Sequence, residues 1–442
     1  MDTTNNFVSW FRSVAPYINA FRGKTFVIAF SGKMTTDEKF VHFIHDINLL
    51  ASLGIRLVLV HGARQQIQLR LDEQQLDSPS VRGMRVTNTA ALQYIKESVG
   101  RVHIEIEALL SMSLPNSPMA NAAIRVTSGN FVIARPAGVI DGVDLMHTGK
   151  VRKINAEAIH SHLQQGDIVL TSPLGYSLTG EIFNLTFEHV ATEIAIALEA
   201  EKLIFLLDPL NTKDDVSENI HSLARELTVA DCKILLNSQH KTQSEDITRY
   251  LNCAIKACET NVTRTHLINH HLDGAILQEL FTHNGIGCMI SQQPLQYLRS
   301  ATINDVGSIL QLIEPLEAEG ILVRRNRELL EIEIDHFVIL EHDSMIIGCA
   351  ALYLYTDQNV CELACLAVHP DYQNTGYGNL LLKHLETKSI EQGIQSIFVL
   401  TTHATHWFIE HGFSETTLTK LPKEKQDLYN YQRRSKVYIK TL

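Results

Sequence analysis

The sequence predicts an α/β chain with two domains, the first built on a parallel sheet and the second a smaller α+β unit. Two observations lead to this prediction. From Thr25 onward, short β-branched runs alternate with helical patterns, whereas beyond about residue 300 three strand patterns follow one another directly. The length of 442 residues is also enough for two or three separate cores.

In the first half, strand and helix patterns alternate as in a parallel sheet with helices on both faces. Strands are expected at residues 25–30, 55–60, 122–127, 131–135, 168–171 and 203–207. Helices are expected at residues 37–53, 154–165 and 185–200. Such sheets bind ligands at the carboxyl ends of their strands. The polar stretch at residues 211–246 is compatible with a hairpin or a loop.

An apolar stripe at helical spacing precedes the first strand and predicts an N-terminal helix at residues 1–20. The stripe consists of Phe7, Trp10, Phe11, Val14 and Ile18. We expect this face to be buried, for example against a neighbouring subunit. Pro16 is expected to end or kink the helix.

In the second half, strands joined by short polar turns are expected to pair as antiparallel neighbours. Three such strands are expected at residues 337–341, 345–355 and 360–368. Two further strands are expected at 396–400 and 436–440, and helices at 305–319, 327–334, 380–392 and around 406. The expected division of the chain is an N-terminal helix at 1–20, a first domain at 21–291, a linker at 292–299 and a second domain at 300–442.

The charge balance excludes some partners. With 38 Lys and Arg against 49 Asp and Glu, the net charge is −11, so broad electrostatic binding of nucleic acid or anionic lipid is not expected. Any anionic ligand needs a local basic cluster. No apolar stretch is long enough to span a bilayer, so we expect a cytoplasmic protein without membrane or nucleic-acid partners.

Metal and disulfide chemistry is not expected either. The seven cysteines form no CxxC pair, which indicates reduced thiols rather than a disulfide framework or a zinc site. Three histidine pairs lack a third ligand at a usual spacing, so no metal is expected. They are His42 and His45, His270 and His271, and His403 and His406.

The sharpest local pattern is the end of a strand, a turn, and then Gln373, Gly376 and Gly378 at the opening of a helix. Glycines let successive backbone N–H groups face one anion, and the helix N-terminus adds partial positive charge. A pyrophosphate group fits such a turn. The alternative is a turn that only caps the helix.

This turn and the preceding run ELACLAV resemble motif A of the GNAT acetyltransferases. The resemblance implies acetyl-CoA as co-substrate, with its pyrophosphate held by Gln373, Gly376 and Gly378. It also implies that strand N–H groups polarise the thioester carbonyl and pair with the pantetheine arm, where one such donor is worth about 3 kcal/mol of barrier. These N–H groups belong to Cys365, Leu366, Ala367 and Val368.

The resemblance extends over the whole chain. A first half with the rhythm of the amino-acid kinases is joined to a second half that contains GILVRRNRE, ELACLAVHP, LTTHATHWF and YNYQRRSKV. This combination resembles the bacterial N-acetylglutamate synthases of the long, arginine-regulated type. The resemblance implies acetyl transfer from acetyl-CoA to the α-amine of L-glutamate, as the first step of arginine biosynthesis. It also implies a homo-oligomer, a hexamer by family resemblance.

By the same resemblance, Arg325, Arg433 and Thr401 bind L-glutamate and Glu362 is the base. The residue types suit these roles, because Arg binds carboxylates through paired N–H groups and a protonated amine must lose a proton before it attacks. The alternatives are solvated surface charges for the arginines and a solvent-facing strand carboxylate for Glu362.

The second half departs from the GNAT pattern at one position. Phe408 stands where many GNAT enzymes have the Tyr that protonates the leaving thiolate. The thiolate then leaves unassisted, through water, or with help from Tyr429 or Tyr431. Direct attack in a ternary complex needs no acyl-enzyme, so Cys365 is interpreted as a packed strand thiol rather than a nucleophile.

The first half departs from the kinases, because Ala29 stands in the slot of their phosphate-binding Lys. A regulatory role is therefore expected, with L-arginine as effector. The resemblance assigns its site to Tyr17, Lys202, His266, Glu279 and Gly287. A carboxylate such as Glu279 pairs with a guanidinium. The alternative is that Lys202 and His266 are ordinary strand-end residues.

Two rival functions remain open. A bifunctional synthase-kinase would release ADP from ATP, and a non-catalytic regulator would bind arginine and CoA without turnover. A basic or protein acceptor is less compatible with two arginines beside the base.

Overall fold

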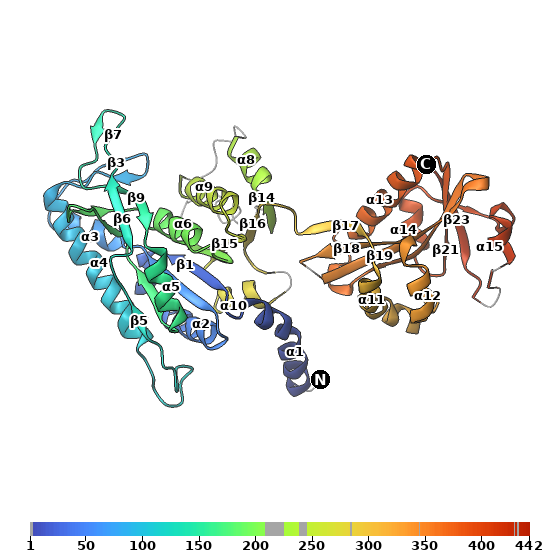
Figure 1. The fold of residues 1–442 in the computed structure, drawn as a ribbon, viewed down its shortest axis with the longest axis horizontal. Coiled ribbons are helices and arrows are strands. Elements are labelled where there is room, and N and C mark those ends of the chain that lie inside the picture. The colour runs from blue at the N-terminus through green and yellow to red at the C-terminus, as the bar shows by residue number, and fades with distance from the viewer. Residues whose placement is uncertain are drawn as a thin grey trace. The chain divides into compact units, whose positions relative to one another are not determined.

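The computed structural model describes residues 3–207, 225–237, 245–282, 285–343, 345–427, 429–430 and 433–442. Two compact units make up the chain, Met1–Pro294 and Leu295–Leu442, here the first and the second unit (Figure 1). Most of the polar stretch at 211–246 lies outside the described residues. Within the described part, no helix has the length and apolar character needed to cross a bilayer.

The first unit is built on an eight-stranded sheet (Figure 1). In spatial order its strands are β14 (Glu226–Thr228), β16 (Cys288–Ser291), β15 (Arg264–Asn269), β13 (Lys202–Leu207), β1 (Thr25–Phe30), β2 (Arg56–His61), β10 (Ile168–Thr171) and β5 (Val126–Thr127). All neighbours run parallel except β15 and β16. The predicted parallel sheet is confirmed.

Smaller strands accompany this sheet. A second sheet contains β12 (Ile182–Asn184), β11 (Leu174–Tyr176), β6 (Val132–Pro136) and β9 (Gly149–Ile154). Two short hairpins are β3 (Ser80–Val81) with β4 (Met84–Arg85), and β7 (Val139–Ile140) with β8 (Val143–Asp144). The strand expected at 122–127 is shorter than predicted, because only Val126 and Thr127 pair with β10.

Helices cover both faces of the large sheet. They are α1 (Thr3–Phe21), α2 (Phe40–Ser52), α3 (Arg64–Glu73), α4 (Thr89–Leu110), α5 (Ala156–Gln164), α6 (Phe187–Ala197), α8 (Val229–Asn237), α9 (Glu245–Glu259) and α10 (Ala275–Phe281). Alternation along β1 explains the two layers. Val27 and Ala29 face α6 and α9, whereas Phe26, Ile28 and Phe30 face α2, α4 and α10.

The N-terminal helix is present as expected, and it does not end at Pro16 but continues to Phe21. Its C-terminal end is anchored by Phe21, whose ring centroid lies 5.3 Å from that of Phe26 and 5.9 Å from that of Phe281. Val14 is buried as well. The N-terminal part of the apolar stripe is exposed on this chain, namely Phe7, Trp10 and Phe11.

The second unit contains a seven-stranded sheet. Its order is β17 (Gln296–Ser300), β18 (Phe337–His342), β19 (Met345–Tyr355), β20 (Val360–Val368), β21 (Ser396–Thr401), β23 (Lys436–Thr441) and β22 (Ser414–Thr416). Only β20 and β21 pair in parallel. The helices are α11 (Val306–Ala318), α12 (Arg327–Ile332), α13 (Tyr377–Glu391), α14 (Thr405–Glu410) and α15 (Lys423–Asp427). Helix α13 packs on one face and α11 with α12 on the other.

The boundary between the units lies within the expected linker at 292–299, but the second half of that segment is a strand. The units meet between Pro294 and Leu295, and residues 296–300 form β17, an edge strand antiparallel to β18. The run QYLRS is too short and too polar to signal a strand by itself. Its strand character comes from pairing with β18, where Leu298 lies opposite Leu340.

Candidate functional site

The neighbouring strands β20 and β21 of the second unit separate towards their carboxyl ends, and the predicted site residues lie at this separation. The parallel pairing of β20 with β21 extends from Val360 to Leu363, and no pairing between them continues beyond Leu363 within the described residues. On the other side, the register of β20 against β19 shifts between Ala364 and Ala367. This shift is a bulge that contains Cys365, whose φ is 52°.

The bulge and the separation have one consequence for the backbone of β20. Between Ala364 and Val368, groups that would otherwise bond to β21 are available to a ligand. The predicted acetyl-CoA segment, Cys365 to Val368, is this part of the strand. The thiol of Cys365 is buried beside Cys349, whose Sγ lies 3.6 Å from the Cys365 carbonyl oxygen. Cys365 thus packs in the core, as interpreted from the sequence.

The Gly-rich turn joins this strand end to a helix N-terminus. Gln373 Nε2 donates to the Val368 carbonyl oxygen at 3.1 Å, which ties the turn to β20. Gly376 caps α13 with a φ of 91°, a left-handed conformation that disfavours any side chain. A Cβ at Gly378 would lie 3.3 Å from the Trp407 ring. The first-turn N–H groups of α13 therefore lie in an anion-binding arrangement at the end of β20.

Glu362 is buried on β20, which contradicts the alternative of a solvent-facing carboxylate. Its side chain is 5% exposed, and its Oε1 lies 2.8 Å from Nζ of Lys425. Burial raises the pKa of Glu362, while Lys425, Arg325 and the Tyr355 hydroxyl oppose that rise. A carboxylate with a raised pKa inside a pocket suits proton transfer.

Arg325 lies beside this carboxylate and is held by a small network. Its backbone N–H donates to Glu317 Oε1 at 2.9 Å. Burial alone would lower the pKa of Arg325, but Cys365, Tyr353 and Glu333 raise it overall. The Tyr353 hydroxyl in turn donates to Glu333 Oε2 at 2.6 Å. Sequence reasoning missed Tyr353 and Glu333, because the strand register that brings them here leaves no local signal.

Arg433 approaches the same place from the chain's C-terminal segment. Its Nη2 donates to the carbonyl oxygens of Gly320 and Ile321. Burial lowers the pKa of Arg433, and the charge of Arg325 lowers it further. Arg433 Nε is buried with no hydrogen-bond partner among the described residues. Two like charges kept together in this way favour an anionic ligand.

Thr401 ends β21 near the point of separation. Its hydroxyl oxygen accepts bonds from the backbone N–H of His403, at 3.4 Å, and of Ala404, at 3.1 Å. Its own O–H is not used by these two bonds and can donate.

Phe408 is a core residue. It is 3% exposed and meets Phe413 edge-to-face with ring centroids 5.3 Å apart. The Tyr429 hydroxyl donates to the Ser435 carbonyl oxygen at 2.7 Å, and Tyr431 lies outside the described residues. No acid for the leaving thiolate is therefore assigned.

In the first unit, the residues expected to bind the effector form one buried chain of contacts. Lys202 Nζ lies 3.1 Å from His266 Nε2, and His266 Nδ1 lies 2.6 Å from Glu279 Oε1. Glu279 Oε2 accepts from the N–H groups of Ile286 and Gly287, at 2.8 Å each. The three side chains come from β13, β15 and α10, which the parallel pairing of β13 with β15 brings together.

Aromatic rings complete this group. Lys202 Nζ lies 5.1 Å from the Phe21 ring centroid, and the Tyr17 ring lies 6.2 Å from that of Phe21. All five predicted effector residues are thus near one another, together with Phe21, which sequence reasoning missed.

The ionisation states in this group follow from burial and hydrogen bonding. Burial, followed by the charge of Lys202, lowers the pKa of His266 to about 4, so its ring is neutral at pH 7. Burial alone would raise the pKa of Glu279, but His266 and the two backbone N–H groups lower it to about 2. The arrangement is a cation, a neutral imidazole and a carboxylate in sequence.

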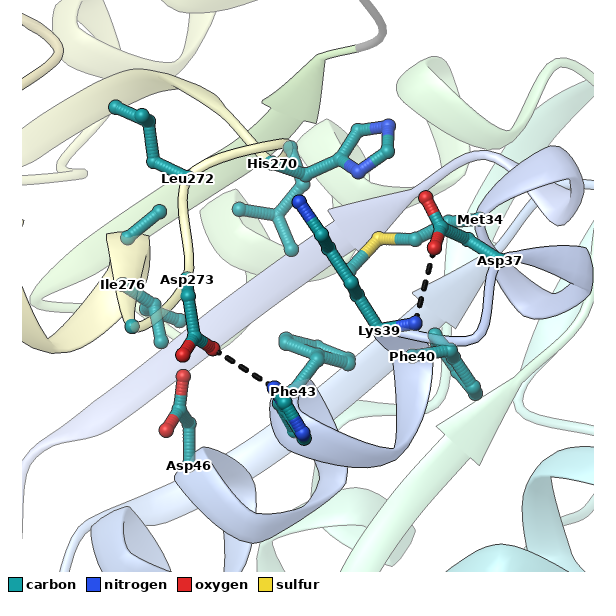
Figure 2. A pocket seen from close by; sticks show the side chains of 14 residues that line it. Met34, Asp37, Lys39, Phe40, Phe43, Asp46, His270, Leu272, Asp273 and Ile276 are labelled. Atoms are coloured by element: carbon teal, nitrogen blue, oxygen red, sulfur yellow. Dashed lines mark hydrogen bonds and ion pairs between the residues drawn. The ribbon is translucent and has the colours of Figure 1, made fainter.

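A separate pocket lies at the carboxyl end of the large sheet. Figure 2 shows the side chains of Asp46 and Asp273 facing each other in this pocket. Burial and the charge of Asp273 raise the pKa of Asp46 to about 7. Ala29, which stands in the slot of the kinases' phosphate-binding Lys, is fully buried and offers no polar group to a ligand.

The fold brings Asp37 next to His270 and His271, one of the histidine pairs that lacked a third ligand in the sequence. Ligand atoms of Asp37, His270 and His271 lie within 4.8 Å of one another. Atoms bound to one zinc ion lie only about 3.4 Å apart. The Lys39 ammonium also donates to the His271 carbonyl oxygen at 3.2 Å, which brings a competing positive charge to the cluster. We therefore assign no metal here.

Comparison with known proteins agrees with this architecture. Residues 24–269 match the amino acid kinase family, and residues 307–413 match the acetyltransferase (GNAT) family. The amino-acid acetyltransferase of Ralstonia nicotianae is 49% identical over 99% of this chain and 95% of its own. That of Proteus mirabilis is 48% identical over 99% of this chain and 98% of its own.

Solved structures show the same relationship. The N-acetylglutamate synthase from Neisseria gonorrhoeae complexed with coenzyme A and L-arginine is 37% identical, with a TM-score of 0.87 over 99% of both chains. Its complex with coenzyme A and N-acetyl-glutamate has a TM-score of 0.61 over the same coverage. The resemblance inferred from the motifs is confirmed, and the chain belongs to the amino-acid acetyltransferases, enzymes that join an amino-acid-kinase-like domain to a GNAT domain.

Proposed function

We propose that this enzyme transfers the acetyl group of acetyl-CoA to the α-amine of L-glutamate, the first step of arginine biosynthesis. The observation that carries the proposal is the convergence of Glu362, Arg325 and Arg433 where β20 and β21 separate. The Neisseria complexes with coenzyme A and with N-acetyl-glutamate support the same chemistry.

The opening of β20 and the N-terminus of α13 are the acetyl-CoA site in this proposal. The N–H groups at the turn, with Gly376 and Gly378, receive the pyrophosphate. The free backbone between Cys365 and Val368 pairs with the pantetheine arm and polarises the thioester carbonyl. A cofactor so placed projects its thioester toward Glu362, which lies on the same strand.

The acceptor site follows from charge. L-Glutamate carries two carboxylates, and Arg325 and Arg433 supply two partly buried guanidinium groups that repel each other until anions arrive. The unpartnered Nε of Arg433 is a donor for one of those carboxylates. The Thr401 hydroxyl is a further donor.

The reaction is a direct attack in the ternary complex. The α-ammonium loses a proton to Glu362, directly or through water, and the amine nitrogen attacks the thioester carbonyl carbon. Strand N–H groups stabilise the oxyanion. The C–S bond then breaks, the attacking nitrogen gives up its second proton through water, and the amide and the CoA thiolate are formed. Phe408 has no proton to give, so the CoA thiolate leaves unassisted, or takes up a proton through water or from Tyr429 or Tyr431.

The first unit is the sensor of the end product in this proposal. L-Arginine binds at Lys202, His266 and Glu279, with its guanidinium against Glu279 and its carboxylate against Lys202. The effector acts by binding one arrangement of the protein more tightly than another. The exposed Phe7, Trp10 and Phe11 on α1 support assembly into a homo-oligomer, since such a stripe is covered by a neighbour.

A thiol-release assay tests the function. The enzyme is incubated with acetyl-CoA and each of L-glutamate, L-aspartate, L-glutamine and L-ornithine, and the product is identified by mass spectrometry. CoA release that depends on L-glutamate and yields N-acetylglutamate is expected. ADP release from ATP and N-acetylglutamate would instead support a bifunctional enzyme, and binding without turnover a regulator.

A further inference from the structure

The ion pair between Glu362 and Lys425 joins two distant parts of the second unit. Lys425 belongs to α15, a short helix that sequence reasoning did not connect with the site. Its Nζ lies 2.8 Å from Glu362 Oε1, with the two side chains 24% and 5% exposed. At this distance and burial the contact is a charge-assisted hydrogen bond, not a solvated surface pair.

Helix α15 is held against the sheet on the same face as Glu362. Leu421, just before it, is 3% exposed and packs with Phe398 and Val437. Phe398 is the register partner of Glu362 on β21, so the anchor lies beside the carboxylate. Gln426 Nε2 donates to the Leu421 carbonyl oxygen at 2.6 Å, which closes the turn. The position of Lys425 is therefore set by packing.

The charges around Glu362 show why a dedicated cation matters. Three groups face the carboxylate: Lys425 from α15, the Tyr355 hydroxyl from β19, and Arg325 from the segment before α12. Glu424 also acts on Tyr355 and adds negative charge nearby. If Arg325 binds a substrate carboxylate, as the proposed function requires, its charge is neutralised in the ternary complex. Among these three groups, Lys425 is then the one that still places a full positive charge beside the Glu362 carboxylate.

We propose that Lys425 is a positioning residue for the acetyl transfer, which keeps the buried Glu362 carboxylate ionised and oriented while the anionic substrate is bound. This proposal rests on the proposed function. The ammonium holds Oε1 and so limits rotation of the carboxylate, and it offsets the two negative charges that L-glutamate brings. Lys425 itself transfers no proton in this scheme.

The test compares pH profiles of kcat at saturating acetyl-CoA and L-glutamate. Lys425→Met and Lys425→Gln remove the charge, Lys425→Arg keeps it, and Lys423→Met is the matched control, since Lys423 lies on the same short helix but is exposed. In the two uncharged variants, the acidic limb of kcat is expected to move to higher pH by about one unit, with about tenfold lower kcat below it. Lys425→Arg is expected to restore the limb, and Lys423→Met to match the wild type.

The outcomes separate the two proposals. An active wild type whose acidic limb is unchanged by Lys425→Met and Lys425→Gln, whether or not kcat falls, would overturn the positioning role alone. Failure of Lys425→Arg to restore the limb in a folded variant, checked by thermal unfolding, would overturn it as well. A wild type that releases no CoA with L-glutamate would overturn the proposed function, and this inference with it.

Discussion

Two of the buried glutamates of this enzyme, one in each unit, are in opposite electrostatic situations. In the first unit, Glu279 has both oxygens engaged, by His266 and by the N–H groups of Ile286 and Gly287, and its pKa falls to about 2. In the second unit, Glu362 is held by Lys425 and Tyr355, and burial keeps its pKa above the ordinary value.

This difference separates binding from catalysis. A carboxylate that three hydrogen-bond donors stabilise stays ionised over the whole physiological range, and its remaining acceptor position suits a guanidinium. A buried carboxylate with fewer partners takes up a proton more easily, which suits a base. The number of donors around each oxygen, rather than burial itself, therefore distinguishes the proposed effector residue from the proposed base.

The largest expected effect comes from Glu362→Gln, which removes the proton acceptor but keeps the size of the side chain. We expect kcat to fall about 10²- to 10⁴-fold. The loss is expected to be greatest at low pH and to shrink as the pH approaches the pKa of the substrate amine, which then loses its proton without help. Steady-state kcat across pH measures this. A wild-type to variant ratio that stays constant with pH would make Glu362 a structural residue.

Glu279→Ala removes the other carboxylate and is expected to abolish inhibition by L-arginine while uninhibited turnover stays near the wild-type level. A coupling free energy of about 1–3 kcal/mol means that L-arginine changes the affinity for the substrate by about 5- to 150-fold. Inhibition curves at fixed L-glutamate measure it. Deleting residues 1–20 is expected to weaken inhibition, because Phe21 and Lys202 then lose the support of α1.

The sensor proposal has a clear contrary result. If the Glu279→Ala enzyme is inhibited as strongly as the wild type, and L-arginine competes simply with L-glutamate, the first unit does not bind the effector at this group. Asp273→Asn is the matched control, because Asp273 lies just before the same helix but outside the Lys202–His266–Glu279 group.

Gly376→Val tests the cofactor site apart from both carboxylates. The left-handed φ of 91° costs a β-branched residue at least about 1–2 kcal/mol, and the turn must distort to relieve it. Binding of acetyl-CoA is expected to weaken by about 10- to 100-fold, with L-glutamate binding nearly unchanged, as measured by calorimetry. Gly393→Val is the control, since Gly393 has a φ of 78° just after the opposite end of α13. If the folded Gly376→Val enzyme binds acetyl-CoA as tightly as the wild type does, the turn before α13 is not the acetyl-CoA site.

The smallest expected effect concerns a third carboxylate, Asp46, which faces the carboxylate of Asp273 (Figure 2). Its pKa in the folded protein, about 7, lies above the value in the unfolded chain. The folded state therefore loses stability as the pH rises from about 4 to about 7, which is the reverse of the sign for Glu279.

Asp46→Asn is expected to remove this penalty. The melting temperature should rise by a few degrees at about pH 8 and by less at about pH 5, with exposed Asp77→Asn as control. Thermal unfolding followed by circular dichroism at both pH values measures it. Equal gains at the two pH values would mean that Asp46 is not protonated more readily in the folded state.

Much of this enzyme was already determined by local sequence. The strand and helix periods, and the glycines of the turn after β20, depend on backbone preferences within a few residues. They were enough to predict the parallel sheet, the α+β second unit and the position of Gly376. The motif resemblance then pointed to Glu362, Arg325, Arg433 and the residues around Glu279 as candidate site residues. The structure brings the residues of each unit near one another.

Only the tertiary structure decided which partners these residues have. The contact of Lys202 with His266 depends on the register of β13 against β15, and the contact of Glu362 with Lys425 depends on the packing of Leu421 against Phe398. The strand β17 exists because β18 offers it an edge. Charge pairs and edge strands of this kind join segments far apart in the chain, and their energies depend on register and burial, which no local pattern encodes.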